Sequence, residues 1–186
     1  NRGPTDQIAD ILYTTERGAH DNLAREGVDA SRVRFVGNVM IDSLQANRRL
    51  ACPPDETLRR AGFGTLMQEA SRGYGVVTLH RPSNVDRAET LGPLLAVLSE
   101  VAQTLPLVFA LHPRTRANIT RLGLEHLVAS ERMVLLPPQG YLEMLGLISN
   151  AMLVLTDSGG LQEETTALGV PCLTMRENTE RPVTID

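Results

Sequence analysis

The chain has 186 residues and a net charge of −4, with acidic and basic side chains interspersed along its length. This length suits one sizeable α/β domain with part of another, and the charge argues against nucleic acid or an anionic membrane as the main partner. No apolar run approaches the roughly 20 residues that a membrane-spanning helix needs, so we expect no membrane partner.

Apolar runs that suit strands alternate with stretches that suit helices along the whole chain. In chain order we expect strand 8–13, helix 16–26, strand 33–36, helix 41–50, a polar helix ending near 70, strand 74–79, helix 87–105, strand 107–111, helix 114–122, strand 133–136, helix 141–149, strand 152–155, a helix beginning near 158, and strand 171–174. Repeated strands with helical crossovers predict an α/β fold, a doubly wound parallel sheet of the Rossmann-like kind.

The chain begins at Asn1 without Met and stops after a polar, charged segment, so we expect an excerpt of a longer polypeptide. The hinge between its domains is expected at 37–41, where a short strand ends in Gly-Asn. Cys52 and Cys172 form no metal or redox motif, which indicates inert thiols of a cytoplasmic protein.

Polar residues follow the expected strands at the point where each strand ends. They are His80 and Arg81, His112 and Arg114, Gln139, the run 157–160, and the run 176–182. In doubly wound sheets ligands bind beyond the carboxyl ends of strands, so these residues are candidates for a site. Each also has an ordinary structural alternative: a buried, satisfied histidine, a solvated arginine, or a turn glutamine whose amide could equally read a base or sugar edge.

The run Ser158-Gly159-Gly160 follows a buried strand and opens a helix. Two glycines at a helix N-terminus let an anion approach unpaired N–H groups, and Glu163 and Glu164 on the next turn would suit a polyol. Together they suggest a nucleotide-sugar, although Ser158 is also a good N-cap and Gly-Gly a common tight turn.

Arg181 suits bidentate phosphate contact, or it is a loop charge. A basic edge that carries histidines suits a diphosphate without a metal, and no Asp/His cluster has metal-ligand spacing.

These motifs together resemble the non-hydrolysing UDP-N-acetylglucosamine 2-epimerases. The resemblance rests on His80-Arg81, the His-Pro at 112–113, Pro138-Gln139-x-Tyr141, the run 157–164 (Asp-Ser-Gly-Gly-x-Gln-Glu-Glu), Gly169-Val-Pro171, the run 176–182, and the run 37–42. It implies a two-domain GT-B fold, of which residues 1–40 would be the end of the N-terminal Rossmann-like domain with the hinge. Residues 41–186 would then be the C-terminal UDP-binding Rossmann-like domain, truncated before its last helices.

The resemblance also implies roles for matching residues. Ser158, Gly159 and Gly160 would hold the diphosphate, and Glu164 would bind the ribose diol. His80 and Arg181 would meet the phosphates, and His112 would lie close to the sugar-phosphate bond. Gln139 would lie near the uracil, and Met144 stands where relatives have an apolar base contact. In some bacterial relatives the pair at 80–81 touches a second, regulatory substrate molecule, which makes Arg81 a candidate allosteric residue.

The implied enzyme is an isomerase that interconverts UDP-N-acetylglucosamine and UDP-N-acetylmannosamine, without a cofactor or metal. UDP would be eliminated to give a 2-acetamidoglucal intermediate and then added back. The family's proton-transfer residues belong upstream of Asn1, so this chain alone is expected to bind UDP weakly and not to epimerise. The full-length protein is expected to be a homodimer that serves cell-surface polysaccharide biosynthesis.

Two alternatives stay open at this point. A GT-B glycosyltransferase that uses a UDP-sugar would share the fold and the phosphate-binding turn, but it would transfer the sugar to an acceptor. A non-catalytic module that binds nucleotide-sugars would leave C2 of the sugar untouched.

Overall fold

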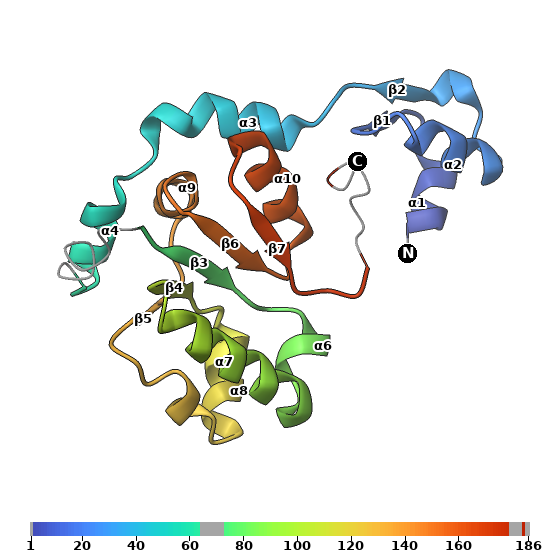
Figure 1. Cartoon of the computed structure of the whole chain (residues 1–186). Helices are drawn as coiled ribbons and strands as arrows, with labels where there is room; N and C mark the ends of the chain where they lie inside the picture. The colour runs from blue at the N-terminus through green and yellow to red at the C-terminus, as the bar shows by residue number, and fades with distance from the viewer. Residues whose placement is uncertain (1, 64–72, 179–183, 185–186) are drawn as a thin grey trace. The chain divides into compact units, whose positions relative to one another are not determined.

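The structure is a computed structural model that describes residues 2–63, 73–178 and 184 (Figure 1). The chain divides into two compact units, residues 1–46 and residues 47–186. No helix among the described residues is long and apolar enough to cross a membrane.

The first unit contains two short parallel strands, with Leu12 opposite Val33. Its elements are α1 (Arg2–Ile8), β1 (Leu12–Thr14), α2 (Ala19–Arg25), the 3₁₀ turn η1 (Ala30–Arg32), β2 (Val33–Phe35) and most of α3 (Val39–Asn47). Its small core consists of Leu12, Leu23, Val28 and Val33.

The expected strand 8–13 is only partly correct, because α1 includes Ile8 and β1 starts at Leu12. The reason is a long-range contact. The guanidinium of Arg32 donates to the carbonyl oxygens of Asp6 and Ala9, 3.0 Å away in each case, and so satisfies the end of the helix. Ile8 is largely exposed, so no sheet face buries it.

The second unit contains the larger sheet and its flanking helices. Its elements are the 3₁₀ turn η2 (Arg48–Leu50), α4 (Pro54–Arg60), β3 (Gly75–Thr78), α6 (Pro82–Val85), α7 (Ala88–Ala102), β4 (Leu107–Ala110), α8 (Pro113–Arg121), the 3₁₀ turn η3 (Glu125–Leu127), β5 (Met133–Leu136), α9 (Tyr141–Ser149), β6 (Leu153–Thr156), α10 (Gly159–Leu168) and β7 (Cys172–Thr174). The expected polar helix toward 70 begins as α4, and its expected end falls in 64–72, outside the described residues.

Five parallel strands form this sheet in the order β5-β4-β3-β6-β7. The α/β fold with a doubly wound parallel sheet is therefore confirmed. The chain moves outward from β3 in one direction through β4 and β5, and then crosses back to place β6 and β7 on the other side of β3. The sheet changes direction between β3 and β6, and ligands bind at such switch points in α/β folds.

Successive residues of each strand supply opposite faces of the sheet, as the two-residue period of a strand requires. Val76, Val108, Val134 and Val154 belong to one cluster, with side chains from α4, α9 and α10. The neighbouring residues Val77, Phe109 and Leu155 belong to the other cluster, with side chains from α7 and α8. Figure 1 shows α9 and α10 on one side of this sheet and α7 and α8 on the other. Both faces are covered, so the strands are continuous apolar runs.

The backbone of α9 lies unusually close to the segment before α4. A Cβ at Gly146 would be 1.8 Å from the carbonyl oxygen of Cys52, so only glycine fits there. The amide of Cys52 donates to the carbonyl oxygen of Leu142 at 3.0 Å, which fixes this approach.

Candidate functional site

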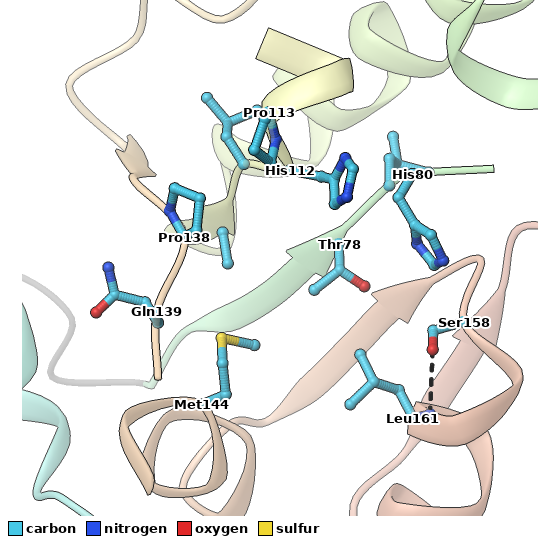
Figure 2. A pocket seen from close by; sticks show the side chains of 12 residues that line it. Thr78, His80, His112, Pro113, Pro138, Gln139, Met144, Ser158 and Leu161 are labelled. Carbon is cyan, nitrogen blue, oxygen red and sulfur yellow. Dashed lines mark hydrogen bonds between the residues drawn. The ribbon is translucent and has the colours of Figure 1, made fainter. Parts of the chain in front are cut away.

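A pocket of about 280 Å³ lies at the carboxyl end of β3, where the strand order reverses. Figure 2 shows the side chains around it. Its lining residues follow or end strands β3, β4, β5 and β6: Thr78, Leu79, His80, Ala110, Leu111, His112, Pro113, Pro138, Gln139, Met144, Ser158 and Leu161. The structure thus brings His80, His112, Gln139, Met144 and Ser158 together around one space.

The turn after β6 presents the beginning of α10 to this pocket. Ser158 is the N-cap, with an extended backbone (φ −89°, ψ 122°), and its hydroxyl accepts the Leu161 amide at 3.4 Å (Figure 2). Gly159 and Gly160 are the first two helical residues, so their amides precede the first intrahelical hydrogen bond. These amides and the positive end of the helix dipole suit an anion.

The fully buried Asp157 holds the loop after β3 against this turn. Its Oδ2 accepts the backbone amides of His80 at 3.0 Å and Arg81 at 2.8 Å, and Nδ2 of Asn84 at 3.2 Å. Its Oδ1 lies 2.8 Å from Nδ1 of His80. From the sequence, Asp157 was placed in the polar run 157–160 but was given no role of its own. The sequence feature that pointed to Asp157 was its position directly before Ser158. The groups that donate to its carboxylate, on His80 and Asn84, lie more than 70 positions away along the chain.

His112 reaches the pocket from the N-terminus of α8. It is the N-cap of that helix, and its Nδ1 accepts the amide of Arg114 at 3.2 Å. The rings of His80 and His112 lie 5.8 Å apart between centroids and are tilted by 42°. Neither histidine is fully buried, so neither is the satisfied core histidine that was its structural alternative.

Arg114 pairs with Asp86 and does not line the pocket. Its Nε and Nη2 reach the two carboxylate oxygens of Asp86 at 2.7 and 2.6 Å, and Asn118 adds a bond at 3.1 Å. The hydrogen bond from Arg114 lowers the pKa of Asp86, and the charge of Arg114 adds to this. This pair ties the end of α6 to α8 and so helps to fix where His112 stands.

Two adjacent carboxylates of α10 differ in exposure. Glu163 is buried, whereas Glu164 is only partly buried. Burial, and then the charge of Glu163, raises the pKa of Glu164. Burial raises the pKa of Tyr141 as well, and the charge of Glu164 adds to this. Glu164 is the carboxylate that was expected to bind a ribose, and the burial of Glu163 was not foreseen from sequence.

Gln139 and Met144 approach from the opposite side of the pocket to Ser158 (Figure 2). Gln139 lies between β5 and α9, and its Nε2 donates to the carbonyl oxygen of Pro137 at 2.7 Å. Met144 lies on α9 and is partly buried. A flexible thioether beside a side-chain amide forms a wall that suits a flat, partly polar ring.

The two remaining candidates are arginines. Arg81 follows His80 and is partly buried, and its Nε donates to the carbonyl oxygen of Asp157 at 3.3 Å. Arg181 lies outside the described residues. Within the described part of the chain, no group of three or more His, Cys, Asp or Glu side chains could hold a metal ion.

Comparison with known proteins identifies the family. A family model described as UDP-N-acetylglucosamine 2-epimerase matches residues 1–186. A protein of that name from Methanococcus maripaludis is 36% identical over the whole chain, which covers 50% of that relative. A UDP-2,3-diacetamido-2,3-dideoxy-D-glucuronate 2-epimerase from Pseudomonas aeruginosa is 41% identical over 97% of this chain and 47% of its own length.

The solved structures agree. The crystal structure of the Methanocaldococcus jannaschii UDP-GlcNAc 2-epimerase in complex with UDP-GlcNAc and UDP matches with a TM-score of 0.84 and 35% identity. The match includes the whole of this chain and 50% of the M. jannaschii chain. The Neisseria meningitidis enzyme bound to UDP-GlcNAc matches with a TM-score of 0.73 and 28% identity. The chain thus spans about half the length of the relatives it matches, which have the GT-B fold. The chain belongs to the UDP-N-acetylglucosamine 2-epimerase family.

Proposed function

We propose that this chain is the UDP-binding half of a UDP-N-acetylglucosamine 2-epimerase. The observation that carries the proposal is the pocket in which the N-terminus of α10 faces His80 and His112. The relatives bound to UDP or UDP-GlcNAc support the choice of ligand. In this proposal residues 1–40 are the end of the N-terminal domain with the hinge, and residues 41–186 are the nucleotide-binding domain.

In the proposed complex the diphosphate lies on the amides of Gly159 and Gly160 and the hydroxyl of Ser158. His80 and Arg181 meet the phosphates, His112 lies near the bond between sugar and phosphate, and Glu164 binds the ribose diol. Gln139 and Met144 contact the uracil, and Arg81 is the candidate contact for a second, regulatory substrate molecule. The raised pKa of Glu164 is consistent with a carboxylate that gains partners when hydroxyl groups arrive.

The proposed reaction starts with loss of UDP from C1 of the sugar together with the C2 proton. That C2 hydrogen is adjacent to no ring carbonyl, so it becomes labile only as the C1–O bond breaks. The product is a 2-acetamidoglucal, and UDP then adds back as the proton returns on the opposite face of C2. Negative charge develops on UDP during this step. Helix dipole, imidazole and guanidinium groups are the donors that stabilise such charge.

The proton chemistry requires a base, and none of the pocket residues given above is a carboxylate. We therefore propose that the 186-residue chain alone binds UDP weakly and does not epimerise. In the complete protein, which we propose is a homodimer of the cytoplasm, residues outside this chain supply the base.

One observation favours a second sugar. The 41% identical relative from Pseudomonas aeruginosa is named for UDP-2,3-diacetamido-2,3-dideoxy-D-glucuronate, which differs from UDP-N-acetylglucosamine at C3 and C6. The same elimination at C1 and C2 would serve both substrates, so this sugar is the second candidate.

Proton NMR of the complete protein in D₂O tests the proposal with both UDP-sugars. An epimerase places deuterium at C2 and forms the manno product from its own substrate. If neither result is observed with either sugar, the proposal is contradicted. A glycosyltransferase or a non-catalytic binding module then remains. A glycosyltransferase would then transfer the sugar to an acceptor, and a binding module would return it unchanged.

Calorimetric titration of the 186-residue chain with UDP tests the binding half separately. At about pH 5.5, His80→Gln should weaken UDP binding by about tenfold or more, because it removes a donor that carries charge when both ring nitrogens are protonated. His126→Gln is the matched control, because His126 is exposed outside the pocket and its Nδ1 lies 3.2 Å from the carbonyl oxygen of Gly123. Equal loss in both variants would contradict the proposed site.

A further inference from the structure

The two pocket histidines have opposite partners at the same ring nitrogen. Nδ1 of His112 faces the backbone amide of Arg114, which can only donate, so this nitrogen must carry a lone pair. Nδ1 of His80 faces the carboxylate of Asp157 at 2.8 Å, which can only accept when ionised. The neutral rings are therefore opposite tautomers: His112 carries its proton on Nε2, and His80 carries its proton on Nδ1.

The carboxylate of Asp157 is fixed beside the ring of His80. It is fully buried, and the amides of His80 and Arg81 bind it from the backbone, so the loop after β3 holds the carboxylate in place. The second nitrogen of His80, Nε2, has no hydrogen-bond partner among the described residues, and His80 lines the pocket. A buried carboxylate that binds one ring nitrogen fixes the orientation and tautomer of a histidine. The other ring nitrogen is then available to a ligand in the pocket.

We propose that Asp157 is a positioning residue that makes His80 a proton-dependent donor to the diphosphate. While Asp157 holds the Nδ1 proton, Nε2 of neutral His80 is a lone pair and repels a phosphate oxygen. Only the doubly protonated ring donates from Nε2 and adds a positive charge. His112, by contrast, donates from Nε2 while neutral. This inference rests on the proposed function for its ligand, but its statement about the tautomers does not.

The ionisable side chains near His80 in the described part of the chain include Asp157, Arg81 and His112. Asp157 approaches from the turn after β6, Arg81 follows on the same loop, and His112 approaches from α8. Only Asp157 contacts a ring nitrogen of His80. Arg81 has donors only, and the Nδ1 lone pair of His112 already accepts the amide of Arg114, so neither takes the place of the carboxylate as acceptor of the His80 Nδ1 proton.

Asp157→Asn should exchange the tautomer of His80 while keeping the shape of the side chain. The amide oxygen should occupy the place of Oδ2, because three donors, from His80, Arg81 and Asn84, meet there, against one backbone amide, that of His80 at 3.1 Å, at the place of Oδ1. The amide nitrogen then stands beside Nδ1 of His80 and donates to it. The backbone amides around position 157 can only donate, so they keep the amide oxygen on their side. The imidazole of His80 can adapt, because its proton can move from Nδ1 to Nε2.

Long-range proton–nitrogen NMR of the 186-residue chain reads the tautomers directly, with His80→Gln used to assign the signals. At about pH 8.5 the wild-type chain should show His80 protonated on Nδ1 and His112 on Nε2. Asp157→Asn should move the His80 proton to Nε2 and leave His112 unchanged. If neutral His80 of the wild-type chain is protonated on Nε2, the proposal is overturned. This test needs no variant, so it holds even if Asp157→Asn misfolds.

Binding of UDP-N-acetylglucosamine supplies the second measurement, because the diphosphate of this diester does not titrate between the two pH values used. Between about pH 5.5 and about pH 8.5 the wild-type dissociation constant should rise about tenfold or more, as a charged donor is replaced by a lone pair. Asp157→Asn should flatten this dependence, because its neutral His80 still donates from Nε2. A purely structural role would instead weaken binding by the same factor at both pH values, which would contradict the proposal.

Asn84→Ala is the matched control. It removes one donor to the same carboxylate, and a bond to the carbonyl oxygen of Met175, but leaves the pairing of Asp157 with His80 in place. Its tautomers and its pH dependence should remain those of the wild type, and a flattened dependence in this control would also contradict the proposal. If the wild-type chain shows the expected tautomers but binds no UDP-sugar at either pH, the proposed function has failed and the role of Asp157 in orienting His80 stands.

Discussion

The phenol of Tyr74 supports the end of α9, and its removal should destabilise the larger unit. Tyr74 is buried, and its hydroxyl donates to the carbonyl oxygen of Leu147 at 2.8 Å. That carbonyl lies in the last turn of α9, and the Ala151 amide that could have reached it donates to Ile148 instead. Tyr74→Phe keeps the ring but leaves a buried acceptor without its donor. Such a loss costs about 1–3 kcal/mol, and about 2 kcal/mol corresponds to a fall in Tm of roughly 4–8 °C.

Urea unfolding followed by circular dichroism measures this cost. Tyr141→Phe is the matched control, because Tyr141 begins the same helix but is exposed and makes no hydrogen bond through its hydroxyl in the described part of the chain. Its free energy of unfolding should change by less than about 0.5 kcal/mol. Equal effects of the two substitutions would refute the reasoning.

The same phenol predicts how stability depends on alkaline pH. Burial raises the pKa of Tyr74 far above its ordinary value. The stabilisation from a neutral Tyr74 is complete below the unfolded-state pKa of about 10 and is lost as pH rises above it, because only the unfolded chain ionises readily. The difference in unfolding free energy between wild type and Tyr74→Phe should therefore narrow above about pH 10.

Two further substitutions test the packing of α9 and the placement of a carboxylate on α10. Gly146→Ala should destabilise the fold by about 1–3 kcal/mol in urea unfolding, because its Cβ meets the Cys52 carbonyl, and this outweighs the better helix propensity of alanine. Gly18→Ala, where nothing lies within 4 Å, should have little effect, and a similar loss there would contradict the reasoning. Glu164→Gln should weaken UDP binding, because Glu164 is the proposed contact for the ribose. It should also stabilise the chain at neutral pH, because burial and Glu163 raise the pKa of Glu164 and so penalise its charged form. The stabilisation should vanish below about pH 4, and greater stability of the wild type at neutral pH would contradict it.

The parallel sheet could be predicted from sequence because both of its faces are covered. Its strands are therefore uninterrupted apolar runs, and β5 (Met133–Leu136) and α9 (Tyr141–Ser149) have the bounds that the pattern predicts. The short helix α6 was missed, because a four-residue helix that begins at Pro82 has no apolar period to detect. In the first unit the pattern predicted a strand where α1 ends, since the capping contact from Arg32 is invisible in the local sequence.

Strand ends were also sufficient to select the side chains that surround the pocket. His80, His112 and Ser158 are separated along the chain, but each directly follows a strand or opens a helix at the same edge of the sheet. The partner of each histidine could not be selected in this way. Whether Asp157 is buried, and whether it meets a ring nitrogen, depends on the register of β3 against β6, which pairs Thr78 with Thr156.

The two walls of the pocket differ in how firmly hydrogen bonds hold them: His80 and Ser158 form the firmly held wall, and Gln139 and Met144 form the other. Asp157 ties the segments carrying His80 and Ser158 to each other by bonds to backbone amides, so changes there disturb the whole wall. Among the described residues, the side chain of Gln139 is hydrogen-bonded only to the neighbouring Pro137 carbonyl, and Met144 is an adaptable side chain. In the proposed complex, substitutions at positions 139 and 144 should therefore change the preferred base and leave the proposed phosphate contacts unchanged. Titration with nucleotide-sugars that carry other bases tests this expectation.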